Sequence, residues 1–108
     1  MNKKVYDTII LGAGAAGLYS GIFAAMHNES VLLLEKCKTP GNKLSITGNG
    51  HCNFTHDEIH ASDYTTDDVD ALILSFSAYS FKDTLRDFMD FGIPSECKNH
   101  GFYPLSQD

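Results

Sequence analysis

The stretch Gly12-Ala13-Gly14-Ala15-Ala16-Gly17 decides the fold of this chain. Residues 5–11 before it, VYDTIIL, predict a buried strand, and residues 18–27 after it predict a helix. Residues 31–34, VLLL, predict a second strand, and Glu35 follows them directly. A strand, a glycine turn, a helix, a strand and an acid in this order predict a β-α-β unit that binds a dinucleotide.

Each position of the glycine turn has a physical role in such a site. Gly12 lets the chain leave the strand sharply, Gly14 leaves room for a pyrophosphate beside the backbone, and Gly17 lets the helix lie close to the sheet. Ala15 and Ala16 offer backbone N–H groups at the positive end of the helix dipole. These groups are expected to face the phosphates of the ligand.

Glu35 supplies the second part of the prediction. An acid about 20 residues after the first glycine binds a ribose 2′-hydroxyl and disfavours a 2′-phosphate, so NADP is not expected as the first ligand. The alternative is a glycine-rich turn that packs a helix tightly on a sheet and binds no ligand.

Size, charge and cysteine content narrow the class of protein. The chain has 108 residues, 43% of them hydrophobic, which is enough for one small globular domain. Its net charge of −6 argues against a nucleic-acid or anionic-membrane surface, and no apolar run approaches the ~20 residues that span a bilayer. The three cysteines, Cys37, Cys52 and Cys97, lack zinc or C-x-x-C spacing. Reduced thiols, a cytoplasmic location and no metal site are therefore expected.

The remainder of the chain predicts a loop and two helices. Residues 45–55 are polar and glycine-rich and predict a functional loop. Thr66 is expected to cap the first helix, whereas Ser80 and Asp83 form a capping-box-like start for the second. Gly92 suits the position after the end of that second helix.

The predicted sheet is incomplete. A doubly wound domain needs at least a third parallel strand and covered faces. The tail, residues 93–108, is expected to be extended or looped, and residues 101–104 within it are not expected to be that strand. We therefore expect the chain to be part of a longer protein.

Two longer motifs bring a family resemblance. Residues 12–17, the LEK sequence at 34–36 and GNKLSITGNGHCN at 41–53 resemble the bacterial flavoproteins called HI0933-like or BaiN-like NAD(P)/FAD-dependent oxidoreductases. The closing GFYPLS at 101–106 is also similar to a segment of that family. The chain departs from the family pattern at Asn42, where arginine is frequent, and through three replacements: Thr47 for serine, Asn49 for glycine and His51 for arginine.

The resemblance implies an FAD site built from both motifs. The ADP half of FAD would lie on residues 12–17 and Glu35. Lys36 and Lys43 would reach phosphate or flavin oxygens. Thr47, Gly48 and Asn53 would donate hydrogen bonds near the isoalloxazine. The candidate cofactor-binding residues are Gly12, Gly14, Ala15, Ala16, Gly17, Glu35, Lys36, Lys43, Thr47, Gly48 and Asn53.

The fold expectation is thus an α/β, Rossmann-like FAD/NAD(P)-binding domain that is incomplete, with residues 1–108 as its N-terminal part. The expected function is an FAD-dependent oxidoreductase that transfers a hydride or electrons to a small-molecule substrate, with NAD(P)H as a candidate electron donor. Two alternatives stay open: a non-enzymatic dinucleotide-binding module, and an inactive truncated product. The sequence assigns no catalytic residue, substrate or oligomeric state.

Overall fold

A computed structural model describes residues 3–106 as two compact units, Met1–Asn49 and Gly50–Asp108, which are taken in turn. The elements of the first unit are β1 (Thr8–Leu11), α1 (Ala15–Met26), β2 (Val31–Leu34) and α2 (Asn42–Ile46), followed at the junction by the short turn η1 (Thr47–Gly50). The elements of the second are β3 (Thr55–His56), η2 (Ala61–Asp63), α3 (Val69–Ala78), α4 (Phe81–Asp90), β4 (Ser95–Lys98) and β5 (Gly101–Pro104). Among the helices of residues 3–106, none qualifies as a membrane-spanning segment.

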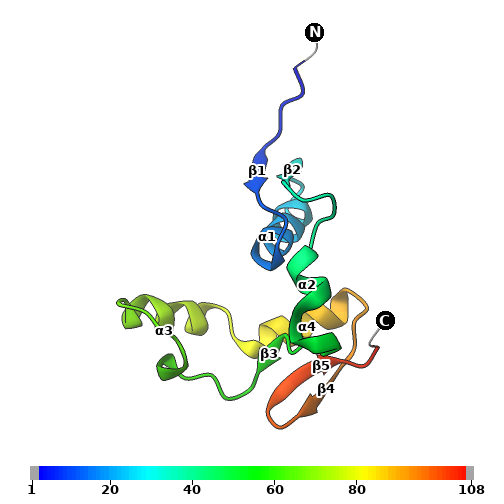
Figure 1. Cartoon of the computed structure of the whole chain (residues 1–108). Coiled ribbons are helices and arrows are strands. Elements are labelled where there is room, and N and C mark those ends of the chain that lie inside the picture. The colour runs from blue at the N-terminus through cyan, green and yellow to red at the C-terminus, as the bar shows by residue number, and fades with distance from the viewer. Residues whose placement is uncertain (1–2, 107–108) are drawn as a thin grey trace. The chain divides into compact units, whose positions relative to one another are not determined.

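The first unit contains the predicted β-α-β arrangement. β1 and β2 pair in parallel, with Thr8 opposite Val31 and Leu11 opposite Leu34, and α1 connects them across one face (Figure 1). The helix lies very close to that face, because a Cβ built on Gly21 would meet Leu33 Cδ1 at 2.9 Å. The α/β fold class predicted from the glycine turn is therefore confirmed.

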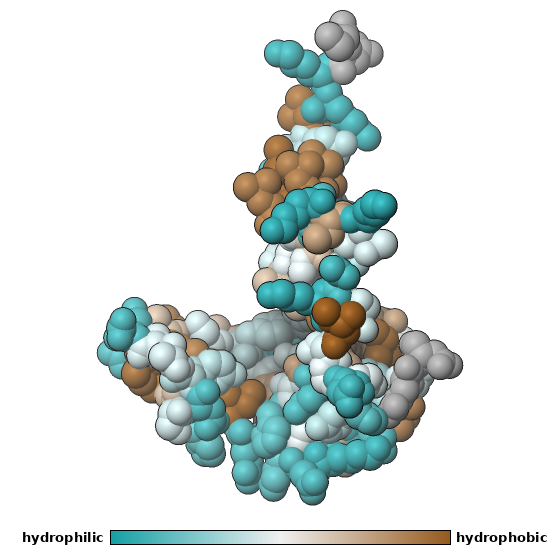
Figure 2. Space-filling view, viewed as in Figure 1, coloured by the Kyte–Doolittle hydropathy of each residue, from teal (hydrophilic) through white to brown (hydrophobic). Residues whose placement is uncertain are grey.

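The other face of the strand pair is uncovered within the described part of this unit. Ile9, Leu11 and Leu34 point to that side and are 58%, 81% and 47% exposed. Figure 2 shows apolar surface gathered over this part of the chain. Parallel strands are normally buried on both faces, which explains why both strands read as continuous apolar runs.

The ends of the first elements differ from the sequence expectation. β1 begins at Thr8 and not at residue 5. β2 begins at Val31, opposite Thr8, so the parallel pairing starts there. The Asp7 carboxylate accepts bonds from the backbone N–H and hydroxyl of Ser30, at 2.8 and 2.7 Å, which ties the entry of β1 to the entry of β2. The helix begins at Ala15, before the expected residue 18, and ends as expected before Asn28, which has a φ of +62°.

The predicted loop at residues 45–55 is only partly a loop. It contains the end of α2, the whole of η1 and the first residue of β3. α2 has five residues, too few for a helical period to show in the sequence. Gly48, Asn49 and Gly50 all have positive φ, at +64°, +51° and +86°, so Asn49 does take the conformation that glycine favours.

The second unit contains a small antiparallel sheet with the strand order β3-β5-β4. Residues 101–104 form β5, which pairs antiparallel with both neighbours, so they are not a third parallel strand, as expected. Aromatic rings pack within this unit: Phe54 stacks on Phe88 with ring centroids 4.0 Å apart, and Phe81 lies 6.0 Å from Phe102.

The two predicted helices are present, with one cap reassigned. Asp68, and not Thr66, caps α3: its carboxylate accepts from Ala71 N–H at 2.9 Å, whereas the Thr66 hydroxyl accepts from Asp68 N–H. The predicted capping box of α4 is confirmed, since Asp83 accepts from the N–H and the hydroxyl of Ser80, both at 2.8 Å. Gly92, after α4, has a φ of +79°.

Candidate functional site

The glycine turn joins the carboxyl ends of the two parallel strands. Gly12 has a φ of +95° and donates its N–H to Leu34 O at 2.7 Å, which ties the end of β1 to the end of β2. A Cβ built on Gly14 would meet no atom within 4 Å, so the space beside the turn is open. A Cβ on Gly17 would lie 1.9 Å from Gly12 O. The close approach that sequence reasoning expected of Gly17 is therefore present.

The start of α1 offers backbone donors to a ligand. The i−4 bonds of the helix begin with Leu18 N–H to Gly14 O at 2.9 Å, which leaves the N–H groups of Ala15, Ala16 and Gly17 without a partner inside the helix. Ala15 and Ala16 are exposed. The first turn of α1 contains no acidic residue, so no side chain of that turn offsets the positive end of the helix dipole. This end is suited to an anion such as a phosphate.

Glu35 stands beside the turn as a fixed anion. Its carboxylate oxygens accept from two backbone N–H groups, Cys37 on Oε1 and Ala13 on Oε2, both at 2.8 Å. The backbone hydrogen bond from Cys37, and next that from Ala13, lowers the pKa of Glu35 below its ordinary value. A carboxylate oxygen has two lone pairs, so each can still accept from a ribose hydroxyl.

The second sequence motif begins against the same turn. Gly41 N–H donates to Ala13 O at 2.7 Å, and Gly41 has a φ of +67° as the N-cap residue of α2. Lys43 lies on α2, and Thr47 and Gly48 follow it in η1; all three are exposed. Lys36 is also exposed, directly after Glu35.

Asn53 belongs to the other unit. It lies against the buried backbone of β5, where a Cβ built on Gly101 would come 3.0 Å from Asn53 Nδ2. The structure thus brings residues 12–17 and Glu35 together at one sheet edge. It starts the segment that carries Lys43, Thr47 and Gly48 at this edge, and it places Asn53 on the antiparallel sheet.

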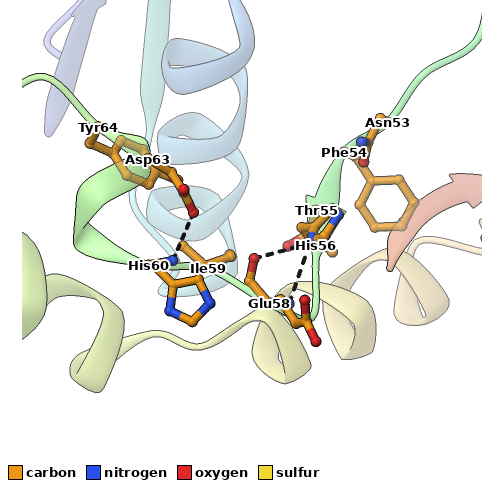
Figure 3. A pocket seen from close by; sticks show the side chains of 9 residues that line it. All are labelled: Asn53, Phe54, Thr55, His56, Glu58, Ile59, His60, Asp63 and Tyr64. Atoms are coloured by element: carbon orange, nitrogen blue, oxygen red, sulfur yellow. Dashed lines mark hydrogen bonds between the residues drawn. The ribbon is translucent and has the colours of Figure 1, made fainter. Parts of the chain in front are cut away.

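A hollow of about 740 Å³ lies in the second unit, next to β3 (Figure 3). Its lining residues are Asn53, Phe54, Thr55, His56, Glu58, Ile59, His60, Asp63 and Tyr64. The Asp63 carboxylate accepts from His60 N–H at 2.9 Å, and Glu58 N–H donates to His56 Nδ1 at 3.3 Å. Among residues 3–106, no group of three or more histidine, cysteine, aspartate or glutamate side chains is placed to hold a metal ion.

The model of the HI0933-like protein Rossmann domain matches residues 6–108. The chain belongs to this family. The names of the similar proteins, among them reductases, support a flavin- and dinucleotide-binding oxidoreductase family. The 3-dehydro-bile acid delta(4,6)-reductase of Clostridium scindens is 31% identical over 99 residues, which cover 90% of this chain and 24% of the relative.

Two further relatives match this HI0933-like chain. The ribosomal RNA dihydrouridine synthase of Haemophilus influenzae is 30% identical over 95 residues, 88% of this chain and 24% of the relative. The thioredoxin reductase of Ureaplasma parvum is 43% identical over 49 residues, 45% of this chain and 16% of the relative. The chain thus spans at most about a quarter of the length of these curated relatives.

Sequence reasoning did not place two residues of the site. Ala13 is 1% exposed and uses both its N–H and its carbonyl, towards Glu35 and Gly41. Gly41 was expected only as a turn residue and as the first residue of the second motif. The sequence offered two signals, a small residue (Ala13) between two glycines and the Pro40-Gly41 pair. Neither reveals a hydrogen bond between segments so far apart.

Proposed function

We propose that this chain is the FAD-binding part of a flavoprotein oxidoreductase, with residues 1–108 as the N-terminal portion of its dinucleotide-binding domain. One observation carries the proposal: Glu35 and the open glycine turn lie together at the carboxyl ends of β1 and β2. Ligands of open α/β sheets bind at this end of the strands.

The ADP half of FAD fits the charges at this edge. The N–H groups of Ala15 and Ala16 would donate to the pyrophosphate, and Gly14 would let it approach the backbone. Glu35 would accept the ribose hydroxyls on the lone pairs that its two backbone bonds leave free.

The flavin half would extend along the second motif. Lys36 and Lys43 would neutralise phosphate or flavin oxygens, because both side chains are exposed near the start of this path. Thr47, the Gly48 N–H and Asn53 would donate hydrogen bonds near the ring. The left-handed turn at Gly48 presents its backbone in a conformation that most side chains would disfavour.

Bound FAD would supply the hydride or electron transfer, and NAD(P)H is the proposed electron donor. The names of the two relatives that match about nine-tenths of the chain point to a reaction class. A delta(4,6)-reductase and a dihydrouridine synthase both add hydrogen across a carbon–carbon double bond. We extend that class to this protein and propose a small molecule as its substrate. The net charge of −6 makes RNA an unfavourable partner for this segment.

The test is spectroscopic. The purified full-length protein should carry the absorption of oxidised flavin. Anaerobic NADH or NADPH should bleach this absorption, and an unsaturated ketone should restore it. Recovery with uridine-containing RNA but not with small alkenes would overturn the substrate class alone. A colourless protein that cannot be reconstituted with FAD would overturn the proposed cofactor.

A second candidate is a dinucleotide-binding module without enzymatic activity. The β1-α1-β2 unit favours it, because the same turn and acid suit the adenosine half of NAD as well as that of FAD. Competition separates the two candidates. NAD that displaces FAD at equal concentration, from a protein that transfers no electrons, would favour the module.

A further inference from the structure

Ala13 is the point where three separate stretches of the chain meet. Its N–H donates to Glu35 Oε2 at 2.8 Å, and its carbonyl accepts from Gly41 N–H at 2.7 Å. Ala13 is also buried, with 1% of its surface exposed. The glycine turn, the acid after β2 and the start of the second motif are therefore held to one small residue.

Gly41 forms hydrogen bonds in two directions at once. Its N–H reaches Ala13, and its carbonyl accepts from Ser45 N–H at 3.1 Å inside α2. It does so with a φ of +67° and a ψ of +21°, a left-handed conformation that favours glycine. A Cβ built there would lie 3.5 Å from Leu18 Cδ1, an ordinary contact. The backbone conformation at Gly41, and not a lack of space, is therefore the constraint.

We propose that Gly41 is a positioning residue that holds the segment carrying Lys43, Thr47 and Gly48 at a fixed place relative to the glycine turn. The inference depends on the proposed function, because those residues are assigned to the flavin half of FAD. The role proposed for Gly41 is carried by its backbone bonds to Ala13 and Ser45 and needs no contact with the ligand. The Gly41–Ala13 bond sets the spacing between the pyrophosphate donors and the flavin donors, so that one extended FAD can reach both.

Two ligands should respond differently to a change at Gly41. ADP would contact only the glycine turn and Glu35, so its affinity should not depend on Gly41. FAD would contact both segments, so its affinity should. The conformation of Gly41 can be disturbed by Gly41→Val, because a β-branched residue at positive φ is strongly disfavoured. Gly41→Asn is the conservative variant, since asparagine tolerates this region.

Gly92→Val is the matched control. Gly92 also has a positive φ, +79°, but it follows α4 in the other unit, and a Cβ there would meet no atom within 4 Å. This variant carries the same kind of backbone strain without touching the Gly41–Ala13 bond. Dissociation constants for FAD and for ADP are measured by titration calorimetry on the full-length apoprotein.

Gly41→Val is expected to weaken FAD binding about tenfold and to change ADP binding by less than about twofold. Gly41→Asn should restore FAD affinity, and Gly92→Val should change neither affinity. Equal losses for FAD and ADP, or no loss for either, would overturn the inference. If Gly41→Val does not fold, amide exchange on the wild type replaces it. FAD should slow exchange of the Gly41 N–H, whereas ADP should leave it nearly unchanged. Equal exchange with either ligand would overturn the inference. A wild type that binds ADP but not FAD would refute the proposed cofactor and the inference with it, whereas a wild type that binds FAD without slower Gly41 exchange would overturn the inference alone.

Discussion

Replacing Gly17 by alanine puts one methyl group between α1 and the end of β1. The added Cβ would lie 1.9 Å from Gly12 O and 3.3 Å from Ile10 Cγ2. Gly12 O shares its peptide plane with the N–H of Ala13, which donates to Glu35. If the carbonyl rotates away from the methyl, that N–H rotates away from the carboxylate as well. The alternative is that α1 moves off the sheet.

The expected cost follows from this geometry. Extra carbon atoms in a packed interior cost about 1–3 kcal/mol, and the upper end applies because the atom that is met belongs to the backbone. Alanine is a better helix former than glycine, which stabilises the folded state by about 1 kcal/mol and offsets part of this cost. We therefore expect Gly17→Ala to lower the free energy of unfolding by about 2 kcal/mol.

The assay is urea unfolding of the full-length apoprotein, with Gly14→Ala as the matched control. Gly14 has a φ of −81° and open space around its Cα, so alanine there should change the free energy of unfolding by less than about 0.5 kcal/mol. If Gly17→Ala unfolds at the same urea concentration as the wild type, the close packing of α1 on the turn is wrong.

The remaining predictions concern binding and pH. Gly14→Ala should weaken FAD binding about tenfold, because its methyl group occupies the proposed path of the pyrophosphate; unchanged affinity in a titration would place the ligand elsewhere. Glu35→Gln should also weaken FAD binding, because an amide offers an N–H to one of two backbone donors; equal affinity for wild type and variant would remove Glu35 from the site. The backbone N–H of Ser80, and next its hydroxyl, lowers the pKa of Asp83 below the ordinary 3.8. Its contribution to stability is therefore complete above pH 3.8 and is lost as the pH falls through the lowered value. The midpoint temperature of thermal unfolding of Asp83→Asn should consequently vary less with pH below 3.8 than that of the wild type. Parallel plots of midpoint temperature against pH for the two proteins would contradict this assignment.

The β-α-β unit could be predicted because short-range rules decide each of its parts. Gly12 forms the turn, and Gly17 makes the close approach of the helix to Gly12, only five residues away. The four apolar residues Val31–Leu34 show no helical period, so they predict a strand. The same holds for the Ser80–Asp83 capping box, which is a four-residue pattern.

What sequence reasoning missed depends on pairing between distant residues. β1 starts at Thr8 because its partner strand starts opposite it, at Val31, and this register is not visible in a local pattern. β3 has only two residues and is a strand because Thr55 and His56 pair with β5. The bond from Gly41 to Ala13 likewise joins two segments that are each recognisable, but whose contact is not. Sequence therefore predicted the elements of the β-α-β unit better than the long-range hydrogen bonds that tie them together.

The two backbone bonds on the Glu35 carboxylate have a consequence for ligand choice. An acid on a free side chain could swing aside and admit a nucleotide with an additional phosphate. Glu35 is tethered at both oxygens, so in the proposed site its charge would stay beside the ribose. This preorganisation lowers the entropic cost of ordering the side chain on binding. In the proposed site, discrimination between adenine nucleotides would therefore already be in place before any ligand arrives.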